Sequence, residues 1–220
     1  MLLNDKAIRD LCVDSLAHLR FQNAVVNSVP FVSMIEPFSE AVSGNGVISY
    51  GLSHAGYDLR LGPEILLFKN SYNEVIDPKK FNSSEYRNRV FDEINLPDTV
   101  MGHRIELLQN YAVTIPPHGY ILGRSYEYLR IPRHLKGRCV GKSTLARSGI
   151  IINTTPLEPG WEGHLTIEIG NITPCPAKVY VMEGIAQLEF ELLTDPPEKD
   201  YAAKGGKYQN QVGVVPARVL

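Results

Sequence analysis

The chain has 220 residues, 44% of them hydrophobic and 21% charged, with a formal net charge of −2 at pH 7. These values are typical of a globular protein that buries a full core, and we expect one domain spanning residues 1–220. The near-neutral charge argues against wholesale binding to a nucleic-acid backbone, which requires a basic surface, so any phosphate that binds should be small and held locally.

The three cysteines are odd in number and widely spaced, at Cys12, Cys139 and Cys175. A disulfide framework is therefore not expected, and a reducing compartment fits the sequence better. There is no run of about eighteen apolar residues, and the first residues lead into no long apolar stretch. We expect a cytoplasmic location and no membrane partner.

Residues 4–20 are predicted to form a helix, because apolar residues recur at helical spacing and Asn4 or Asp5 can cap its start. Residues 21–50 mix valine, phenylalanine, proline, serine and glycine without a clear period. That pattern indicates short strands joined by loops, with no chemistry that the sequence reveals.

The segment 53–62 is predicted to be an amphipathic strand, entered and left through a glycine. Asp58 and Arg60 share one face of this strand and could pair with each other or across a subunit contact. We favour a structural role for them over direct contact with a site. Residues 68–104 are expected to be loops or a surface excursion.

Short strands follow in quick succession, with almost no helical periodicity after residue 20. The predicted strands are 105–108, 111–115, 120–128, 163–169, 178–181 and 185–192. This spacing indicates an all-β fold with minor α content, a barrel or a jelly-roll-like sandwich preceded by an N-terminal helix.

The first candidate site is the stretch that ends Lys142-Ser143-Thr144-Leu145-Ala146-Arg147. If Ser143 opens a helical turn, its hydroxyl and the free backbone N–H groups face an anion. Arg147, four residues later, lies on the same face of the turn. The stretch therefore predicts a place to hold a phosphorylated molecule.

The second candidate is Glu168, on a strand predicted from residue 163 to 170. His164, Thr166 and Glu168 project to one side of this strand, and three apolar residues project to the other. Desolvation by Leu145 and Ile169 would raise the pKa of Glu168 toward the range of a proton shuttle. The remaining alternative is that Glu168 is an ordinary surface acid.

Templates for other chemistries are missing from the sequence. No zinc-deaminase pattern, Walker loop or dinucleotide glycine motif is present, and the six histidines are dispersed. We therefore expect no protein-bound metal and no zinc. Ser143 stays only a weak option as a nucleophile, because the sequence identifies no histidine and aspartate partners for it.

The tail, residues 195–211, is polar and contains prolines and a glycine pair flanked by lysines. A flexible arm of this kind can fold over bound phosphates, and Tyr201 could stack on a nucleoside or hydrogen-bond to it. A merely solvated loop would have a similar composition. The apolar residues 212–216 should dock on the body of the protein and tie the arm down.

Several separated motifs resemble the dCTP deaminase family and the wider dUTPase superfamily. They are HAGYDL at 54–59, EYLRIP at 127–132, GKSTLARSGII at 141–151, TPLEPGWEGHLTIE at 155–168, EGIAQ at 183–187 and GKYQNQ at 206–211. The resemblance covers residues 50–62 and 105–220, in the same order as in the family.

This resemblance implies a distorted β-barrel that assembles as a homotrimer with active sites at subunit interfaces. It implies zinc-independent hydrolytic deamination of dCTP to dUTP and ammonia, which feeds pyrimidine deoxynucleotide synthesis toward dUMP and dTTP. Mg²⁺ is expected to accompany the triphosphate. The implied ligands are dCTP, and also dUTP and dTTP, with no nucleic acid.

Carried over by position, Glu168 is the general base and acid, and Ser143 and Arg147 position the water and hold the developing charge. Lys142 to Arg147 supply phosphate contacts, and Lys207 lies on the phosphates. The full set of expected nucleotide-binding residues is Lys142, Ser143, Thr144, Leu145, Ala146, Arg147, Thr166, Ile167, Glu168, Gln187, Tyr201, Lys207 and Gln211.

One departure and two alternatives accompany this interpretation. Glu158 stands where many relatives have aspartate, which makes a dUTPase-like role less secure. The nearest alternative is a pyrophosphatase, either a dUTPase or a bifunctional enzyme that takes dCTP through to dUMP. Glu168 favours deamination over a simple dUTPase, since a dUTPase needs no carboxylate at that position. A non-catalytic trimeric nucleotide-binding protein is the third, and the intact set of Ser143, Arg147 and Glu168 argues against it.

Overall fold

The computed structural model describes residues 1–13, 32–69, 74–94, 111–153 and 155–219. Its described helices are short: α1 (Asp5–Val13), α3 (Ser84–Val90) and α5 (Ser143–Ala146). The strands are β1 (Ile35–Glu36), β2 (Val42–Gly44), β3 (Val47–Ser53), β4 (Gly56–Phe68), β5 (Phe91–Ile94), β6 (Ala112–Ile115), β7 (Tyr120–Arg130), β8 (Leu135–Gly141), β9 (Ile150–Ile152), β10 (Thr155–Leu157), β11 (Glu162–Asn171), β12 (Ala177–Tyr180) and β13 (Gly184–Leu192).

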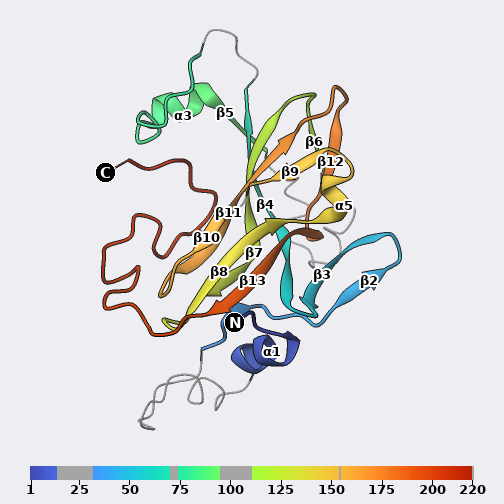
Figure 1. Ribbon diagram of the computed structural model, residues 1–220. Coiled ribbons are helices and arrows are strands. Elements are labelled where there is room, and N and C mark those ends of the chain that lie inside the picture. The colour runs from blue at the N-terminus through green and yellow to red at the C-terminus, as the bar shows by residue number, and fades with distance from the viewer. Residues whose placement is uncertain (14–31, 70–73, 95–110, 154, 220) are drawn as a thin grey trace.

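The strands form one large antiparallel sheet and a separate β12–β6 pair (Figure 1). The main path of the large sheet runs β10-β8-β13-β4-β7-β11-β9. β9, at one end of this path, contacts β8 near the other end, so the sheet curls into a partial barrel. The all-β class that the strand spacing predicts is confirmed, and its apolar faces enclose one large hydrophobic core.

The predicted strands within the described residues are found as β6, β7, β11, β12 and β13. The predicted strand at 105–108 lies outside the described residues. In the part of the chain that the structure describes, no helix is both long and apolar enough to cross a membrane.

The N-terminal helix begins where a capping residue was predicted. Asn4 Oδ1 accepts a hydrogen bond of 3.0 Å from the backbone N–H of Ala7, which satisfies one of the free donors of the first turn. Ile8 and Leu11 are completely buried, so α1 packs against the core as its periodicity indicated. Residues 14–20 of the predicted helix lie outside the described residues.

The region expected to be loops contains regular structure in its described part. Ser83 caps α3, because its hydroxyl oxygen accepts the N–H of Tyr86 at 3.3 Å. β5 then pairs with the end of β4. The expectation of loops was wrong for these residues. The helix has only two turns, which is too short to show a clear apolar period, and its apolar residues Tyr86 and Val90 pack in a small separate cluster instead of the main core.

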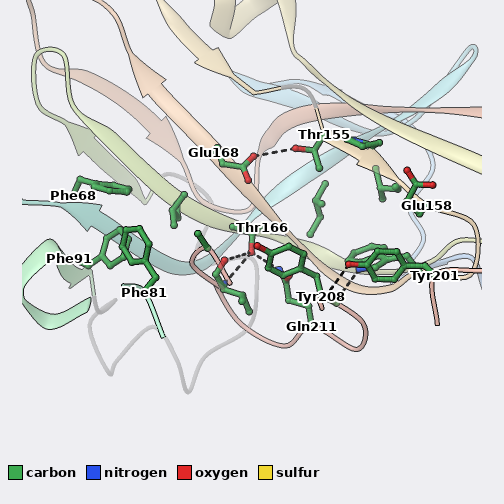
Figure 2. A pocket seen from close by; sticks show the side chains of 17 residues that line it. Phe68, Phe81, Phe91, Thr155, Glu158, Thr166, Glu168, Tyr201, Tyr208 and Gln211 are labelled. Carbon is green, nitrogen blue, oxygen red and sulfur yellow. Dashed lines mark hydrogen bonds between the residues drawn. The ribbon is translucent and has the colours of Figure 1, made fainter. Parts of the chain in front are cut away.

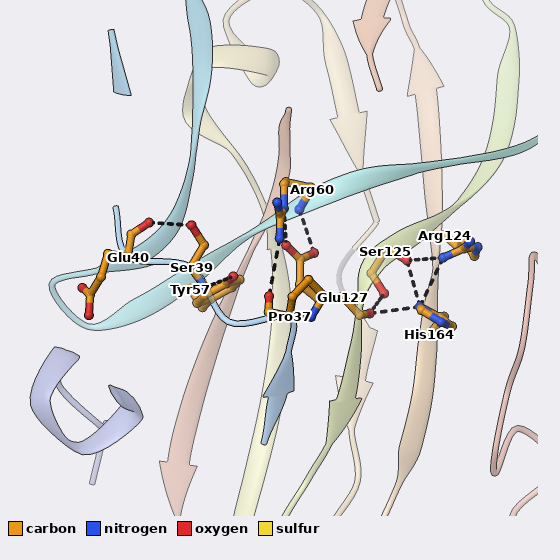
Figure 3. A network of polar contacts seen from close by, with 9 residues as sticks. All are labelled: Pro37, Ser39, Glu40, Tyr57, Arg60, Arg124, Ser125, Glu127 and His164. Carbon is orange, nitrogen blue, oxygen red and sulfur yellow. Dashed lines mark hydrogen bonds and ion pairs between the residues drawn. The ribbon is translucent and has the colours of Figure 1, made fainter. Parts of the chain in front are cut away.

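Asp58 and Arg60 do not pair with each other, as the sequence suggested they could. Arg60 donates from Nε to Glu127 Oε1 at 2.6 Å, and Glu127 is fully buried on β7 (Figure 3). Asp58 instead forms an ion pair with Lys142, just before α5. The pattern of alternation on β4 could not predict this, because both faces of its first half are buried and the partner of each charged residue lies in a distant segment of the chain.

Candidate active site

Glu168 lies on β11 opposite Leu122 of β7, and both residues line a cavity of about 300 Å³ (Figure 2). The hydroxyl of Thr155, at the start of β10, donates a hydrogen bond of 3.4 Å to Glu168 Oε2. Burial raises the pKa of Glu168 above its usual range, and hydrogen bonds from its own backbone and from Thr155 offset this only in part. A raised pKa makes a carboxyl group better suited to take up a proton and return it.

The raised pKa of Glu168 was expected from the sequence, but the apolar residues in the cavity wall beside it are different from the two expected. Leu145 and Ile169 are part of the main core, and neither lines the cavity. Leu122 and Leu165 lie in the cavity wall instead. Sequence spacing could not identify Leu122, because the pairing of β7 with β11 brings it beside Glu168 from a distant part of the chain.

An irregularity in β7 shapes the wall beside Glu168. The register between β7 and β11 shifts between His164 and Thr166. At this point the N–H of Leu165 donates to the hydroxyl of Ser125 at 2.9 Å in place of a backbone carbonyl. Leu165 lines the cavity together with Thr166 and Glu168, which strict alternation along the strand does not predict.

The C-terminal tail forms the opposite wall through Gln211. The side-chain amide of Gln211 donates to the hydroxyl of Thr166 and, at 2.9 Å, to the carbonyl of His164. The backbone of Gln211 also forms a parallel bridge with Gly163. A Cβ atom at Gly163 would lie 2.8 Å from the nitrogen of Gln211, so only glycine permits this approach.

Tyr201 contributes to the cavity from a compact turn of the tail. Its hydroxyl accepts the N–H of Tyr208 at 3.1 Å, and the indole of Trp161 donates to the carbonyl of Tyr208 at 2.8 Å. A Cβ atom at Gly206 would lie 2.0 Å from the ring of Tyr201, so part of the glycine pair serves close packing. Lys207, in contrast, is exposed and donates to the carbonyl of Arg218 at 2.7 Å.

The predicted phosphate-binding stretch forms a separate group. Ser143 does open a helical turn, α5, with Lys142 at its N-cap position. Ser143, Thr144, Ala146 and Arg147 are exposed, and none of these lines the cavity around Glu168. Gln187 is also elsewhere, with its amide 3.2 Å from the hydroxyl of Ser53.

Two of the predicted nucleotide-binding residues are core residues within this chain. Leu145 and Ile167 are 3% and 1% exposed, which leaves only their backbone groups to contact a ligand. The predicted set therefore does not form one group within a single chain, and most of its members belong to two separate places. Glu168, Thr166, Tyr201 and Gln211 meet at one cavity, and the exposed members of the 142–147 stretch lie on another part of the surface.

Sequence reasoning missed the apolar part of the cavity. Phe68, Phe81 and Phe91 line its far end, with Val215 and Ala217 of the tail. All three phenylalanines fall within residues 68–104, the region expected to be loops, where hydrophobic periodicity gives no signal. Tyr208 and Thr155 were also missed, although both lie within the motifs quoted above.

Taken together, the fold and the site define an all-β protein with a carboxyl group of raised pKa in the wall of a cavity. A family model described as dCTP deaminase-like matches residues 33–193. The chain belongs to this dCTP deaminase-like family.

Individual proteins agree with the family model. A dCTP deaminase of Acidobacterium capsulatum is 48% identical over 182 residues, which are 83% of this chain and 89% of that one. A dCTP deaminase of Novosphingobium aromaticivorans is 41% identical over 218 residues, 99% of each chain. The crystal structure of 2'-deoxycytidine 5'-triphosphate deaminase from Agrobacterium tumefaciens superposes with a TM-score of 0.52 and 17% identity; the match covers 87% of this chain and 46% of that one, and supports the fold.

Proposed function

We propose that this protein deaminates dCTP to dUTP and ammonia, with Glu168 as the general base and acid. The family supports the substrate, and the observation that carries the chemistry is a carboxylate of raised pKa in the wall of a cavity. The reaction supplies dUTP for pyrimidine deoxynucleotide synthesis. No zinc is needed in this proposal, because the carboxylate itself activates the water.

In the proposed mechanism Glu168 takes a proton from a water molecule, whose oxygen attacks C4 of the cytosine ring. Glu168 delivers this proton to N3, takes the second proton from the hydroxyl now bound to C4 and delivers it to the amine. The C4–N bond then breaks, the C4 oxygen becomes a carbonyl, and ammonia is released. One water is consumed and the carboxylate is regenerated. Thr155 helps this cycle, because its hydrogen bond orients Glu168 in both protonation states.

We further propose that Ser143 and Arg147 reach Glu168 from a second copy of the chain in a homotrimer. This arrangement would account for the separation of the two groups of residues within one chain. Glu168 also borders a second hollow, whose lining includes Ile151 and Ile172. These side chains are 48% and 60% exposed, which is the kind of apolar surface that a subunit contact covers.

The triphosphate is expected to enter with Mg²⁺, held mainly by the phosphates. Mg²⁺ keeps several waters and usually takes only one or two carboxylates from a protein. The carboxylate of Glu158 is a suitable ligand of this kind, because it lines the cavity and its side chain is 44% exposed. Its ion-pair partner Lys136 lies 3.7 Å away. Lys207 and residues 195–211 would close over the phosphates after binding, with dUTP and dTTP as further ligands.

Incubation with dCTP and Mg²⁺, followed by separation of the nucleotides and assays of ammonia and pyrophosphate, tests this function. Ammonia with dUTP supports the deaminase. Ammonia with dUMP and pyrophosphate would indicate the bifunctional enzyme. If dCTP is unchanged, the deaminase is wrong, and the same assay with dUTP separates a dUTPase from a binding protein.

A further inference from the structure

The cavity continues past Glu168 into a space lined only by apolar side chains, which we call the aromatic pouch (Phe68, Phe81, Phe91 and Leu122). The rings of Phe68 and Phe91 meet edge to face at 4.5 Å, and Phe81 stacks on Phe91 at 5.5 Å. The last three residues of the pouch are each less than a tenth exposed. The pouch is thus lined by apolar side chains that pack against one another.

The pouch begins directly beside the proposed catalytic group. Leu122 is the cross-strand partner of Glu168 and also packs with Phe81 and Phe91. On the other side of Glu168 the wall includes polar groups, those of Thr155 and Glu158, among apolar side chains such as Leu157 (Figure 2). Glu168 therefore lies between a part of the cavity with only apolar side chains and a part that also offers hydrogen-bonding groups.

This boundary orients a cytosine ring whose C4 atom lies at Glu168. The N3 and O2 edge of the ring needs hydrogen-bonding partners and would lose them in the pouch. The C5–C6 edge carries only carbon and hydrogen, and it gains by facing apolar side chains. Position C5, which is adjacent to C4, then points toward Leu122 and the aromatic rings.

We propose that this protein also deaminates cytosine deoxynucleotides with a small apolar group at C5, of which 5-methyl-dCTP is the simplest. This inference rests on the proposed function and extends its substrate class. The reaction consumes one water, forms a C4–O bond and breaks the C4–N bond, so that 5-methyl-dCTP gives 5-methyl-dUTP and ammonia. No oxidant or reductant is required.

Burial of one methyl group in such a space strengthens binding by about fourfold, given the usual gain per buried carbon. The experiment compares kcat/KM for 5-methyl-dCTP and for dCTP on the same enzyme preparation. We expect the kcat/KM for 5-methyl-dCTP to be at least one tenth of that for dCTP, and we refer to this quotient as the ratio below. A lower ratio, with dCTP itself deaminated, would overturn the inference and leave the proposed function intact.

Variants of the pouch test the assignment of its residues. Leu122→Phe adds volume beside Glu168 and should lower that ratio by more than threefold. Val90→Ala is the matched control, because Val90 packs in the same small cluster without lining the cavity, and it should change the ratio by less than threefold. A smaller change with Leu122→Phe, or an equal one with Val90→Ala, contradicts the proposal.

Two further measurements cover the remaining outcomes. If Leu122→Phe does not fold, Phe81→Leu should raise the relative kcat/KM of the larger 5-propynyl-dCTP by more than threefold, and a smaller rise contradicts the pouch. If dCTP is not deaminated, the proposed function fails. Calorimetric measurement of the binding of 5-methyl-dCTP and of dCTP then tests separately whether the pouch accepts a C5 methyl group. Binding of 5-methyl-dCTP more than tenfold weaker than that of dCTP would overturn it.

Discussion

Arg60 and Glu127 form a buried ion pair between β4 and β7. The Glu127 carboxylate accepts the backbone N–H of Arg60 at 3.0 Å and its Nε–H at 2.6 Å, and the two side chains are 10% and 0% exposed. The guanidinium also lies 4.9 Å and 4.6 Å from the ring centres of Tyr50 and Tyr126. Although burial opposes its charge, the pKa of Arg60 is raised by the adjacent carboxylate.

This pair supports the strand that carries Glu168. The hydroxyl of Ser125 donates to the carbonyl of Glu127 at 2.7 Å (Figure 3). It also accepts the N–H of Leu165 at 2.9 Å. The irregular part of β7 is therefore fixed on one side by Arg60 and on the other by β11. A disturbance at Glu127 should reach the cavity wall through Ser125.

Glu127→Ala should lower the free energy of unfolding by about 3–5 kcal/mol, because it leaves the Arg60 guanidinium buried without its counterion. Urea unfolding at a fixed protein concentration measures the loss. The control is Glu189→Ala, which removes the partner of the half-exposed Arg138 at 2.6 Å and should have little effect. Similar losses in both variants would mean that burial of the Arg60 pair does not matter.

Glu168→Gln should keep the nucleotide bound while lowering turnover by at least ~10²-fold, the usual contribution of a general base. The amide has nearly the same shape as the carboxylate but cannot accept the proton of the water. Rapid chemical quench for turnover and calorimetry for dCTP binding give the two quantities separately. Near-normal turnover would remove Glu168 from the mechanism.

The same substitution should stabilise the fold at pH 7. The folded-state pKa of Glu168 is raised from the ordinary value of 4.5, so the folded protein binds more protons than the unfolded chain as pH increases from 4.5 through that raised pKa. The free energy of unfolding therefore falls over this window and stays lower above it. Glu168→Gln lacks this loss: its Tm should exceed that of the wild type at pH 7 and match it near pH 4. An equal difference at both pH values would contradict the linkage.

Thr155→Val should move the acidic limb of the kcat/KM profile to higher pH. The hydrogen bond from Thr155 favours the charged form of Glu168 and lowers its pKa, so its removal allows burial to raise that pKa further. Valine has a similar volume, which limits changes in packing. A pH–rate profile whose acidic limb stays in place would show that Thr155 does not influence the proton shuttle.

Local patterns in the sequence predicted the strands and the place of Glu168 on one of them, because strand alternation and capping depend on neighbours along the chain. The helical turn at Ser143 and the strand at Glu168 are both of this kind. Partners from distant segments were not predictable. Leu122 reaches Glu168 only through the register of β7 on β11, and Arg60 finds Glu127 instead of the nearby Asp58.

The grouping of the site residues also lay beyond local patterns. Motif order along the chain places Ser143 and Glu168 in one set, but the curl of the sheet puts them on different parts of the surface. The aromatic pouch went unnoticed for a related reason. Its rings come from the end of β4, the loop before α3 and the start of β5, so no single segment shows an apolar period.

Trp161 is the single tryptophan of the chain, and its indole contacts the tail, so its fluorescence should report whether the tail is docked. Gln211→Ala removes the side-chain hydrogen bonds to Thr166 and His164 that hold residues 201–211 on β11. The tail should then detach more often, which exposes an indole that is now 6% exposed. We expect a red-shifted emission, stronger iodide quenching and a KM for dCTP that increases several-fold.

Lys207→Ala is the matched control for this experiment. Lys207 lies in the same turn, but it is exposed, and its Nζ contacts the carbonyl of Arg218 and, at 5.1 Å, the ring of Tyr208, which both belong to the tail. Its loss should therefore not release the tail from β11, and the emission of Trp161 should not change. Because Lys207 is proposed to contact phosphates, its KM for dCTP should still rise. Unchanged fluorescence in Gln211→Ala would show that the tail stays docked without that side chain. A shift of equal size in both variants would mean that Trp161 reports general loosening of the turn instead of docking.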